Sequence, residues 1–156
     1  IGLVWRLVGP CEREEVDDAV QQVFVAVFRS LSRFRGRSSL DTWVYRVGTK
    51  VCMTLLRRRY RRRRLPVVRG DPDTVERVPD RERSPEEEAQ GRDIREAVHR
   101  ALGRIDRRRR AVFVLVEMEG KSLEETAGIV GCALGTVKSR LFRARRDLAA
   151  LLEGLG

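Results

Sequence analysis

The sequence predicts an all-α fold of two small helical domains joined by a flexible acidic linker. Apolar residues recur at three- and four-residue steps in both halves of the chain, which is the period of a helix and not of a strand. Aromatic residues make up 6% of the 156 residues and charged residues 36%, a composition that suits helical surfaces. Residues 71–88 instead hold eight acidic residues, three arginines and three prolines, and such a segment cannot bury a core.

Two helices are predicted in the N-terminal part. The first has an apolar face made of Val16, Val20, Val23, Val27 and Leu31, with Phe24 and Phe28 beside it. A break at residues 34–39 follows, where Gly36 and two serines supply turn and cap chemistry. The second helix is expected from about Leu40 to Arg62, with a buried stripe of Leu40, Trp43, Val44, Val47, Val51 and Leu55.

The C-terminal part predicts four more helices. Pro85 followed by three glutamates is a helix start, and the helix has an apolar face of Ile94, Ala97, Val98, Ala101, Leu102 and Ile105. The apolar run 111–118 predicts a helix that stops before Gly120. Ser122 and Glu125 have the spacing of a capping box, so a short helix should run from there to Gly131. A last helix is expected to begin at Thr136.

Charge and composition limit the classes of function. A net charge of +10 indicates a polyanionic partner, most simply nucleic acid. No apolar run approaches the roughly 18 residues that span a bilayer, so we expect no membrane insertion. Chain position 1 is not Met, and we expect a truncated start and no signal peptide.

The cysteine and histidine content argues against a metal centre. Cys11, Cys52 and Cys132 are too far apart for a local zinc site or a disulfide scaffold, which indicates a reducing, cytoplasmic compartment. His99 is the only histidine, and we expect it on a helix surface. The sequence therefore predicts neither a metal nor a cofactor.

The last two predicted helices have the pattern of a helix-turn-helix DNA reader. On a helical wheel of the last helix, Val137, Leu141, Ala144 and Leu148 face the core. The opposite side can enter the major groove, and its residues are Lys138, Ser139, Phe142, Arg143 and Arg146. Thr136 is placed for capping and for a phosphate contact. A lone basic helix is more often a solvated surface, but the capped helix and tight turn before this one favour DNA reading.

Four blocks of residues, in order, resemble the extracytoplasmic-function (ECF) sigma factors of the bacterial sigma-seventy family. These blocks are residues 17–24, 34–36, 42–47 and 135–145. The resemblance implies sigma region 2 at residues 1–64 with an incomplete N-terminus, an acidic linker at 65–85, and sigma region 4 at 86–156. It implies a non-catalytic subunit that binds core RNA polymerase and directs promoter-specific transcription initiation in the bacterial cytoplasm, at the nucleoid.

The same resemblance implies the site residues. The clamp of the largest polymerase subunit would bind Asp17, Asp18, Gln21, Gln22 and Phe24, while the flap of the second subunit would be a further contact. The melted −10 strand would bind Phe34, Arg35, Arg37, Ser38, Tyr45, Arg46 and Lys50, and the −35 duplex would bind the exposed face of the last helix with Thr136. An anti-sigma factor is expected as a further partner.

Some positions depart from the family pattern or keep alternatives open. Lys50 stands where the family usually has Asn, Gln22 where it has Glu, and Ile105-Asp106 where it has Leu-Pro. Trp43 lies on the predicted buried stripe, so core packing is favoured over a direct DNA contact.

The sequence also indicates functions for the two charged segments between the predicted domains. Seven arginines among residues 57–64 favour phosphate tracking over a merely solvated helix end. In the family the linker threads through polymerase channels in place of RNA, and the acidic charge here fits that role.

The sequence argues against two rival functions. A free-standing helix-turn-helix regulator that binds duplex operators as a dimer would need a dimerisation helix, and residues 148–155 are too short for one. An enzyme acting on nucleic acid would need an acidic cluster, a histidine pair or a glycine-rich phosphate loop, and neither predicted module has one.

Overall fold

The computed structural model describes residues 2–11, 13–64 and 85–153, and within these ranges the chain is helical with no strand. The expected all-α class is therefore confirmed, whereas residues 65–84 of the expected linker lie outside the described residues. The elements in order are α1 (Gly2–Val8), α2 (Arg13–Leu31), α3 (Leu40–Arg64), α4 (Pro85–Arg104), α5 (Arg107–Phe113), the π-helical turn η1 (Val114–Met118), α6 (Leu123–Val130) and α7 (Leu134–Glu153).

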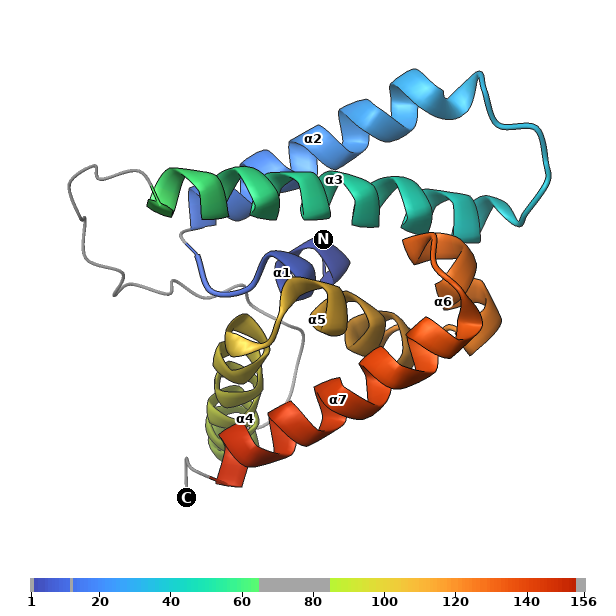
Figure 1. Cartoon of the computed structure of the whole chain (residues 1–156). Coiled ribbons are helices and arrows are strands. Elements are labelled where there is room, and N and C mark those ends of the chain that lie inside the picture. Colours follow the sequence, from blue (N-terminus) through green and yellow to red (C-terminus); the bar gives the residue numbers. More distant parts are fainter. Residues whose placement is uncertain (1, 12, 65–84, 154–156) are drawn as a thin grey trace.

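The N-terminal elements form a helical hairpin over a short helix. Helices α2 and α3 run in opposite directions, and α1 lies under α3, against the C-terminal helices (Figure 1). Helix α1 is not among the helices that the sequence pattern predicts. Its buried residues Val4, Leu7 and Val8 have helical spacing, but a single apolar turn at the start of a chain is a weak signal.

The buried side of α3 differs from the predicted stripe. Leu40 is 52% exposed and Val44 is also exposed, whereas Thr42, Thr49 and Cys52 are buried. The reason is that α1 and α6 pack along α3 in addition to α2, so its most buried face is turned toward them. The predicted faces are also wrong at Leu31, the last residue of α2, and at Ile94 in the middle of α4, because both are exposed.

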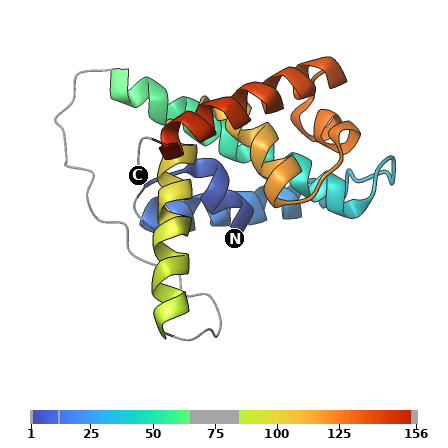
Figure 2. The same ribbon diagram turned by 90° about the horizontal axis from the view of Figure 1, so that it is seen from below.

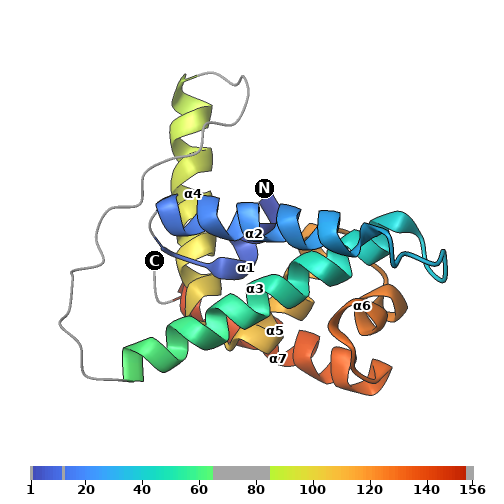
Figure 3. The same cartoon turned by 90° about the horizontal axis from the view of Figure 1, so that it is seen from above.

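A shared core joins the two predicted modules. Val8 from α1, Cys52 from α3, Leu102 from α4, Val114 from η1 and Leu148 from α7 belong to one buried cluster. Figures 2 and 3 show α4 projecting from this body, with α6 beside the beginning of α3. A smaller cluster formed by Val112, Val137 and Leu141 supports the helix-turn-helix unit.

His99 corrects the expectation of a surface histidine. It is only 3% exposed, and its ring stacks on Trp5 with the ring centroids 3.5 Å apart and the planes 6° from parallel. Burial, with a smaller effect of the nearby Arg110 charge, lowers the pKa of His99 to about 4. The histidine is thus a neutral residue of the core. The helical pattern places it beside the apolar face of α4, so its burial could not be predicted from the sequence.

The C-terminal helices begin and end where local chemistry directs them. The Asp106 carboxylate accepts hydrogen bonds from the backbone N–H groups of Arg108 and Arg109, at 3.0 and 3.3 Å, and so caps α5. The departure at Ile105-Asp106 therefore supplies a helix cap. The expected stop before Gly120 is confirmed, because Gly120 has a φ of 65° that favours glycine.

Candidate functional site

The helix-turn-helix unit is built by local capping. The Ser122 Oγ accepts a hydrogen bond from the Glu125 N–H at 3.0 Å, and the Glu125 carboxylate accepts one from the Ser122 N–H at 2.9 Å. This is the predicted capping box, and it is confirmed. Helix α6 ends at Gly131, whose φ of 69° lets the chain turn sharply into α7. The helix-turn-helix geometry is thus set largely by three residues that the sequence identified.

The last helix begins earlier than predicted. Helix α7 starts at Leu134, because the N–H groups of Thr136 and Val137 already donate to the Ala133 carbonyl at 2.9 and 3.1 Å. Thr136 is therefore a half-buried residue of the first turn and not the cap. Its carbonyl accepts a hydrogen bond from the Ser139 hydroxyl at 3.0 Å. The prediction that Thr136 lies near the start of the helix is confirmed, but the prediction that it caps the helix is wrong.

The two faces of α7 are divided as the sequence predicts. Val137, Leu141, Ala144 and Leu148 are buried, and the predicted DNA-reading residues Lys138, Ser139, Phe142, Arg143 and Arg146 are exposed. Phe142 is 68% exposed, although an aromatic ring without a partner is normally buried. An apolar ring between basic side chains on a protruding helix matches a surface that meets base edges and phosphates.

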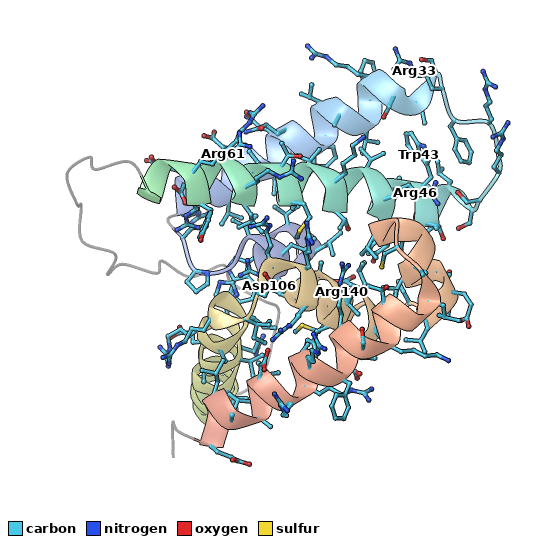
Figure 4. All side chains as sticks on the ribbon, in the orientation of Figure 1. Arg33, Trp43, Arg46, Arg61, Asp106 and Arg140 are labelled. Carbon is cyan, nitrogen blue, oxygen red and sulfur yellow. The ribbon has the colours of Figure 1, made fainter. Side chains whose placement is uncertain are left out.

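Other arginines of α7 are held by protein groups. The Arg145 guanidinium bonds to Glu117 in η1, and the Arg140 guanidinium lies 3.5 Å from the Cys132 sulfur in the turn. Arg140 lies between α5 and α7 (Figure 4). The Asp147 carboxylate pairs with Arg109 of α5 at 2.6 Å. These contacts fix α7 on its support, which leaves Lys138, Arg143 and Arg146 as the basic residues of the outer face.

The loop between α2 and α3 carries the residues predicted to hold a separated strand. Arg35 and Arg37 are exposed, Ser38 is half-buried, and Gly36 has a φ of 66°. The ring of Phe34 lies 5.4 Å from that of Trp43, tilted by 55°. Trp43 is half-buried against this loop, so the structure favours the packing role that the sequence analysis preferred. The Ser39 hydroxyl accepts a hydrogen bond from the Thr42 N–H at 3.1 Å and fixes the start of α3.

Tyr45 faces the C-terminal helices instead of an open DNA-binding surface. Its hydroxyl donates a 2.7 Å hydrogen bond to the Glu119 carboxylate, and the Lys121 ammonium lies 4.2 Å from the centre of its ring. Lys121 also pairs with Asp41 of α3. Burial, and then the bond to Glu119, raises the pKa of Tyr45 to about 12. In this arrangement the predicted strand-capturing face of α3 is in contact with the residues that follow η1.

Arg46 and Lys50 are one turn apart on α3, and their side chains have different neighbours. A terminal nitrogen of Arg46 is 3.4 Å from where a Cβ on Gly128 of α6 would be, and Figure 4 shows Arg46 next to α6. Lys50 is exposed and lines a groove of about 690 Å³ between α2 and α3, together with Gln21 and Gln22. The structure thus brings one predicted −10 residue together with two predicted polymerase-binding residues. Tyr45 and Arg46 do not line this groove.

The predicted polymerase-binding residues form the outer side of α2. Asp17, Asp18, Gln21 and Gln22 are exposed, and Phe24 is 68% exposed. The sequence analysis missed the apolar residues that continue this surface, which are Val25, Phe28 and Leu31, with Phe28 81% exposed. Phe28 and Leu31 were placed with the core face because their spacing is helical. Apolar residues occur around most of the circumference of α2, and this pattern is the signal from which a second packing surface, used for a partner, could have been predicted.

Within the described residues, no helix is long and apolar enough to cross a membrane. In the same part of the chain no group of three or more histidine, cysteine or acidic residues lies close enough to hold a metal ion.

These features define a helical protein with a helix-turn-helix DNA-binding unit at its C-terminal end. Residues 1–62 match the family Sigma-70 region 2, and residues 95–148 match Sigma-70, region 4.

Full-length relatives place the chain more narrowly. It is 31% identical to the RNA polymerase sigma-H factor of Pseudomonas aeruginosa, over 99% of this chain and 81% of the relative. It is 33% identical to the ECF RNA polymerase sigma-E factor of Escherichia coli K12, over 86% of this chain and 72% of the relative. The chain belongs to the ECF RNA polymerase sigma factors, the subunits that direct promoter-specific transcription.

Solved structures support the same fold. The sigma factor RpoE from Bartonella quintana, solved with the anti-sigma factor NepR, is similar with a TM-score of 0.73 and 24% identity, covering 97% of this chain and 90% of that one. CnrH, solved with the cytosolic domain of CnrY, is similar with a TM-score of 0.65 and 26% identity, covering 97% and 79%.

Proposed function

We propose that this sigma factor binds core RNA polymerase through α2, reads the −35 duplex through α7, and captures the melted −10 strand with α3 and the loop before it. The observation that carries the proposal is the exposed face of α7, where Phe142 stands among basic residues on a helix whose other side is fully packed. The protein acts by binding and positioning, with no covalent step of its own.

Recognition of the −35 duplex is assigned to Lys138, Ser139, Phe142, Arg143 and Arg146, with Thr136 near the helix start. Arginine and lysine donate to guanine O6 and N7 in the major groove, and an apolar ring contacts a thymine methyl group. The capping box at Ser122 and the packed arginines Arg109 and Arg140 support this reading helix at a fixed angle. Preorganised support of this kind limits the entropy that is lost on binding DNA.

Capture of the −10 strand is assigned to Phe34, Arg35, Arg37, Ser38, Tyr45, Arg46 and Lys50. Aromatic rings that stack with bases and arginines that contact phosphates are the usual chemistry of single-strand binding. Because Tyr45 is bonded to Glu119 and Arg46 lies beside α6, these two residues reach a strand only when α6 and η1 move away from α3. Lys50 contacts phosphate and cannot pair with adenine as an amide does, so it contributes less base selectivity at its position.

Polymerase binding is assigned to the exposed side of α2. Asp17, Asp18, Gln21, Gln22 and Phe24 would contact the clamp of the largest subunit, and the C-terminal module would contact the flap of the second subunit. An aromatic residue surrounded by polar side chains is a typical interface centre. We propose region 2 at residues 1–64, the acidic linker at 65–85 and region 4 at 86–156.

Regulation and location are proposed from the relatives. The similar sigma factor RpoE was solved in complex with the anti-sigma factor NepR, and the similar protein CnrH was solved in complex with the cytosolic domain of CnrY. We expect an anti-sigma factor for this chain as well, one that holds the two modules together and keeps Tyr45 covered. The site of action is then the bacterial cytoplasm, at the nucleoid where polymerase works.

Run-off transcription tests the proposal. Core RNA polymerase with this chain should give discrete promoter-dependent transcripts from a genomic template, and core enzyme alone should not. If no template yields such transcripts while the chain still binds duplex DNA without polymerase, the protein acts instead as a free-standing helix-turn-helix regulator.

A further inference from the structure

A pocket rich in arginine lies where the two modules meet. It has a volume of about 330 Å³ and lies between the turn after α1, the end of α3 and the junction of α4 with α5. Arg59 comes from α3, Arg104 from α4, and Arg107 and Arg110 from α5. Asp106, seen at the α4–α5 junction in Figure 4, is the one acidic residue among the described residues that line it.

Arg110 is the least satisfied of these arginines. The residue is only 5% exposed, and its Nε is shielded from solvent without a hydrogen-bond partner. Gly9 leaves room for the guanidinium, because a Cβ there would collide with it. Burial, and then the charge of Arg59, lowers the pKa of Arg110 to about 10. A buried guanidinium normally has a counter-charge, since an uncompensated one is costly.

The surrounding groups supply only part of that counter-charge, because the favourable effect of the Asp106 carboxylate on Arg110 is smaller than the effects of burial and of the Arg59 charge. Arg59 donates to the Pro10 carbonyl at 3.2 Å and lies 3.5 Å from Glu15, so its own partner is on the outer side. The Asp106 carboxylate accepts the two backbone N–H groups at the start of α5. By contrast, the neighbouring Arg109 has a full ion pair with Asp147 at 2.6 Å. With Arg59 paired to Glu15, three further guanidinium groups, those of Arg104, Arg107 and Arg110, face one carboxylate, so the pocket keeps a net positive charge.

The chemistry of the missing partner follows from charge, shape and size. Guanidinium groups bind phosphate oxygens in pairs of parallel hydrogen bonds, and phosphate carries more charge than a single carboxylate. The pocket is at the lower end of the roughly 300–1,000 Å³ that is usual for small-ligand sites. We propose that this pocket binds a small phosphate-bearing anion, of the phosphate or pyrophosphate type, with Arg110 at its base and Arg107 at its side.

Such an anion would bridge the two modules. Arg59 belongs to the end of the N-terminal hairpin, and Arg107 and Arg110 belong to the helix that supports α7. A ligand bound to both sides favours the arrangement in which they are close, by its differential affinity for that state. Arg104, Arg107 and Arg110 are not among the residues assigned to promoter recognition, and only Arg59 belongs to the arginine run at residues 57–64, so variants of the other arginines test the site without DNA.

Calorimetric titration of the full chain with inorganic pyrophosphate, at constant ionic strength, tests the proposal. We expect saturable binding at one site. Arg107→Gln should weaken it by about tenfold or more, because one charge-assisted hydrogen-bonding group is lost. The matched control is Arg108→Gln, an exposed arginine on the same helix that does not line the pocket, and it should change the affinity less than about twofold. Arg104→Gln, at an exposed lining residue, gives a second test if Arg107→Gln fails to fold.

Competition experiments distinguish the sources of phosphate. Under the proposal, pyrophosphate and phosphate compete for one site, while a short DNA duplex of unrelated sequence and a hexaglutamate peptide do not displace pyrophosphate. The proposal is overturned by an absence of saturable pyrophosphate binding or by equal losses in Arg107→Gln and Arg108→Gln. It is also overturned if binding that depends on Arg107 is found only for the duplex or only for the acidic peptide.

Discussion

The Tyr45 hydroxyl donates a 2.7 Å hydrogen bond to the Glu119 carboxylate, which joins the first turns of α3 to the end of η1. The other oxygen of Glu119 accepts a bond from the Arg6 guanidinium at 2.7 Å. One carboxylate therefore connects α1, α3 and the C-terminal helices. In the proposed function this contact must break before Tyr45 reaches a promoter strand.

Loss of this carboxylate should loosen the contact between the modules. We expect Glu119→Ala to lower the free energy of unfolding by roughly 1.5–3 kcal/mol, because hydrogen bonds to a charged group are removed. It should also raise the affinity for a single-stranded −10 oligonucleotide, since Tyr45 is released. Urea unfolding and fluorescence anisotropy measure the two effects. Glu124→Ala, at an exposed glutamate of α6, is the control. Lower stability without tighter strand binding would mean that the contact is only structural.

Arg143 should matter for the −35 duplex and not for folding. Arg143→Ala removes an exposed side chain of α7, so we expect little change in the melting temperature. Its affinity for a duplex containing the −35 element should fall by about 1–3 kcal/mol, the range for a base contact. Arg108→Ala carries the same charge change outside α7. Equal losses of affinity in the two variants would show that only net charge is involved.

The buried histidine predicts a pH dependence of stability. The pKa of His99 is about 4 in the folded chain and near 6.5 when unfolded, so the unfolded state binds a proton first as the pH falls. Stability from this group is complete above pH 6.5 and is lost progressively between 6.5 and 4. Between pH 7 and 5 we expect a loss on the order of 1–2 kcal/mol. Unfolding curves of His99→Gln should be flatter over this range, and an unchanged slope would contradict the burial of a neutral imidazole.

The capping box at Ser122 should contribute to stability of the helix-turn-helix unit. Ser122→Ala should lower the free energy of unfolding by about 1 kcal/mol, because the Glu125 N–H loses its acceptor. Ser122→Asp should retain most of that stability, because aspartate is also a good cap. Chemical denaturation checks both variants. If aspartate fails to rescue the loss, the serine contributes by something other than capping.

The outer face of α2 should bind polymerase without supporting the fold. Phe24→Ala should leave the melting temperature nearly unchanged, because the ring is 68% exposed. Its affinity for core RNA polymerase should fall by about 1–2 kcal/mol, as for an aromatic residue at an interface. Leu40→Ala, at an exposed apolar residue at the start of α3, is the control, and surface plasmon resonance measures both. Unchanged affinity of Phe24→Ala would move the polymerase site away from α2.

Features that depend on neighbouring residues, such as helix periodicity and helix caps, could be predicted from the sequence alone. Helical periodicity, the Ser122 and Glu125 pair, and Gly131 were enough to predict the helix-turn-helix unit and the buried and exposed faces of α7. These features depend on residues within one or two turns of each other, so no tertiary information is needed. The resemblance to ECF sigma factors also came from short ordered blocks, and the comparisons confirm it.

Long-range packing decided the rest. Which side of α3 is buried depends on α1 and α6 as well as α2, so the stripe with Leu40 and Val44 was wrong. The same applies to His99, which is buried because Trp5 lies about ninety residues earlier in the chain and stacks on it. The bond of Tyr45 to Glu119 and the arginine pocket around Arg110 also join residues from distant segments. The periodicity of a sequence shows which residues are apolar, but only the tertiary structure determines which of them are buried and which elements cover them.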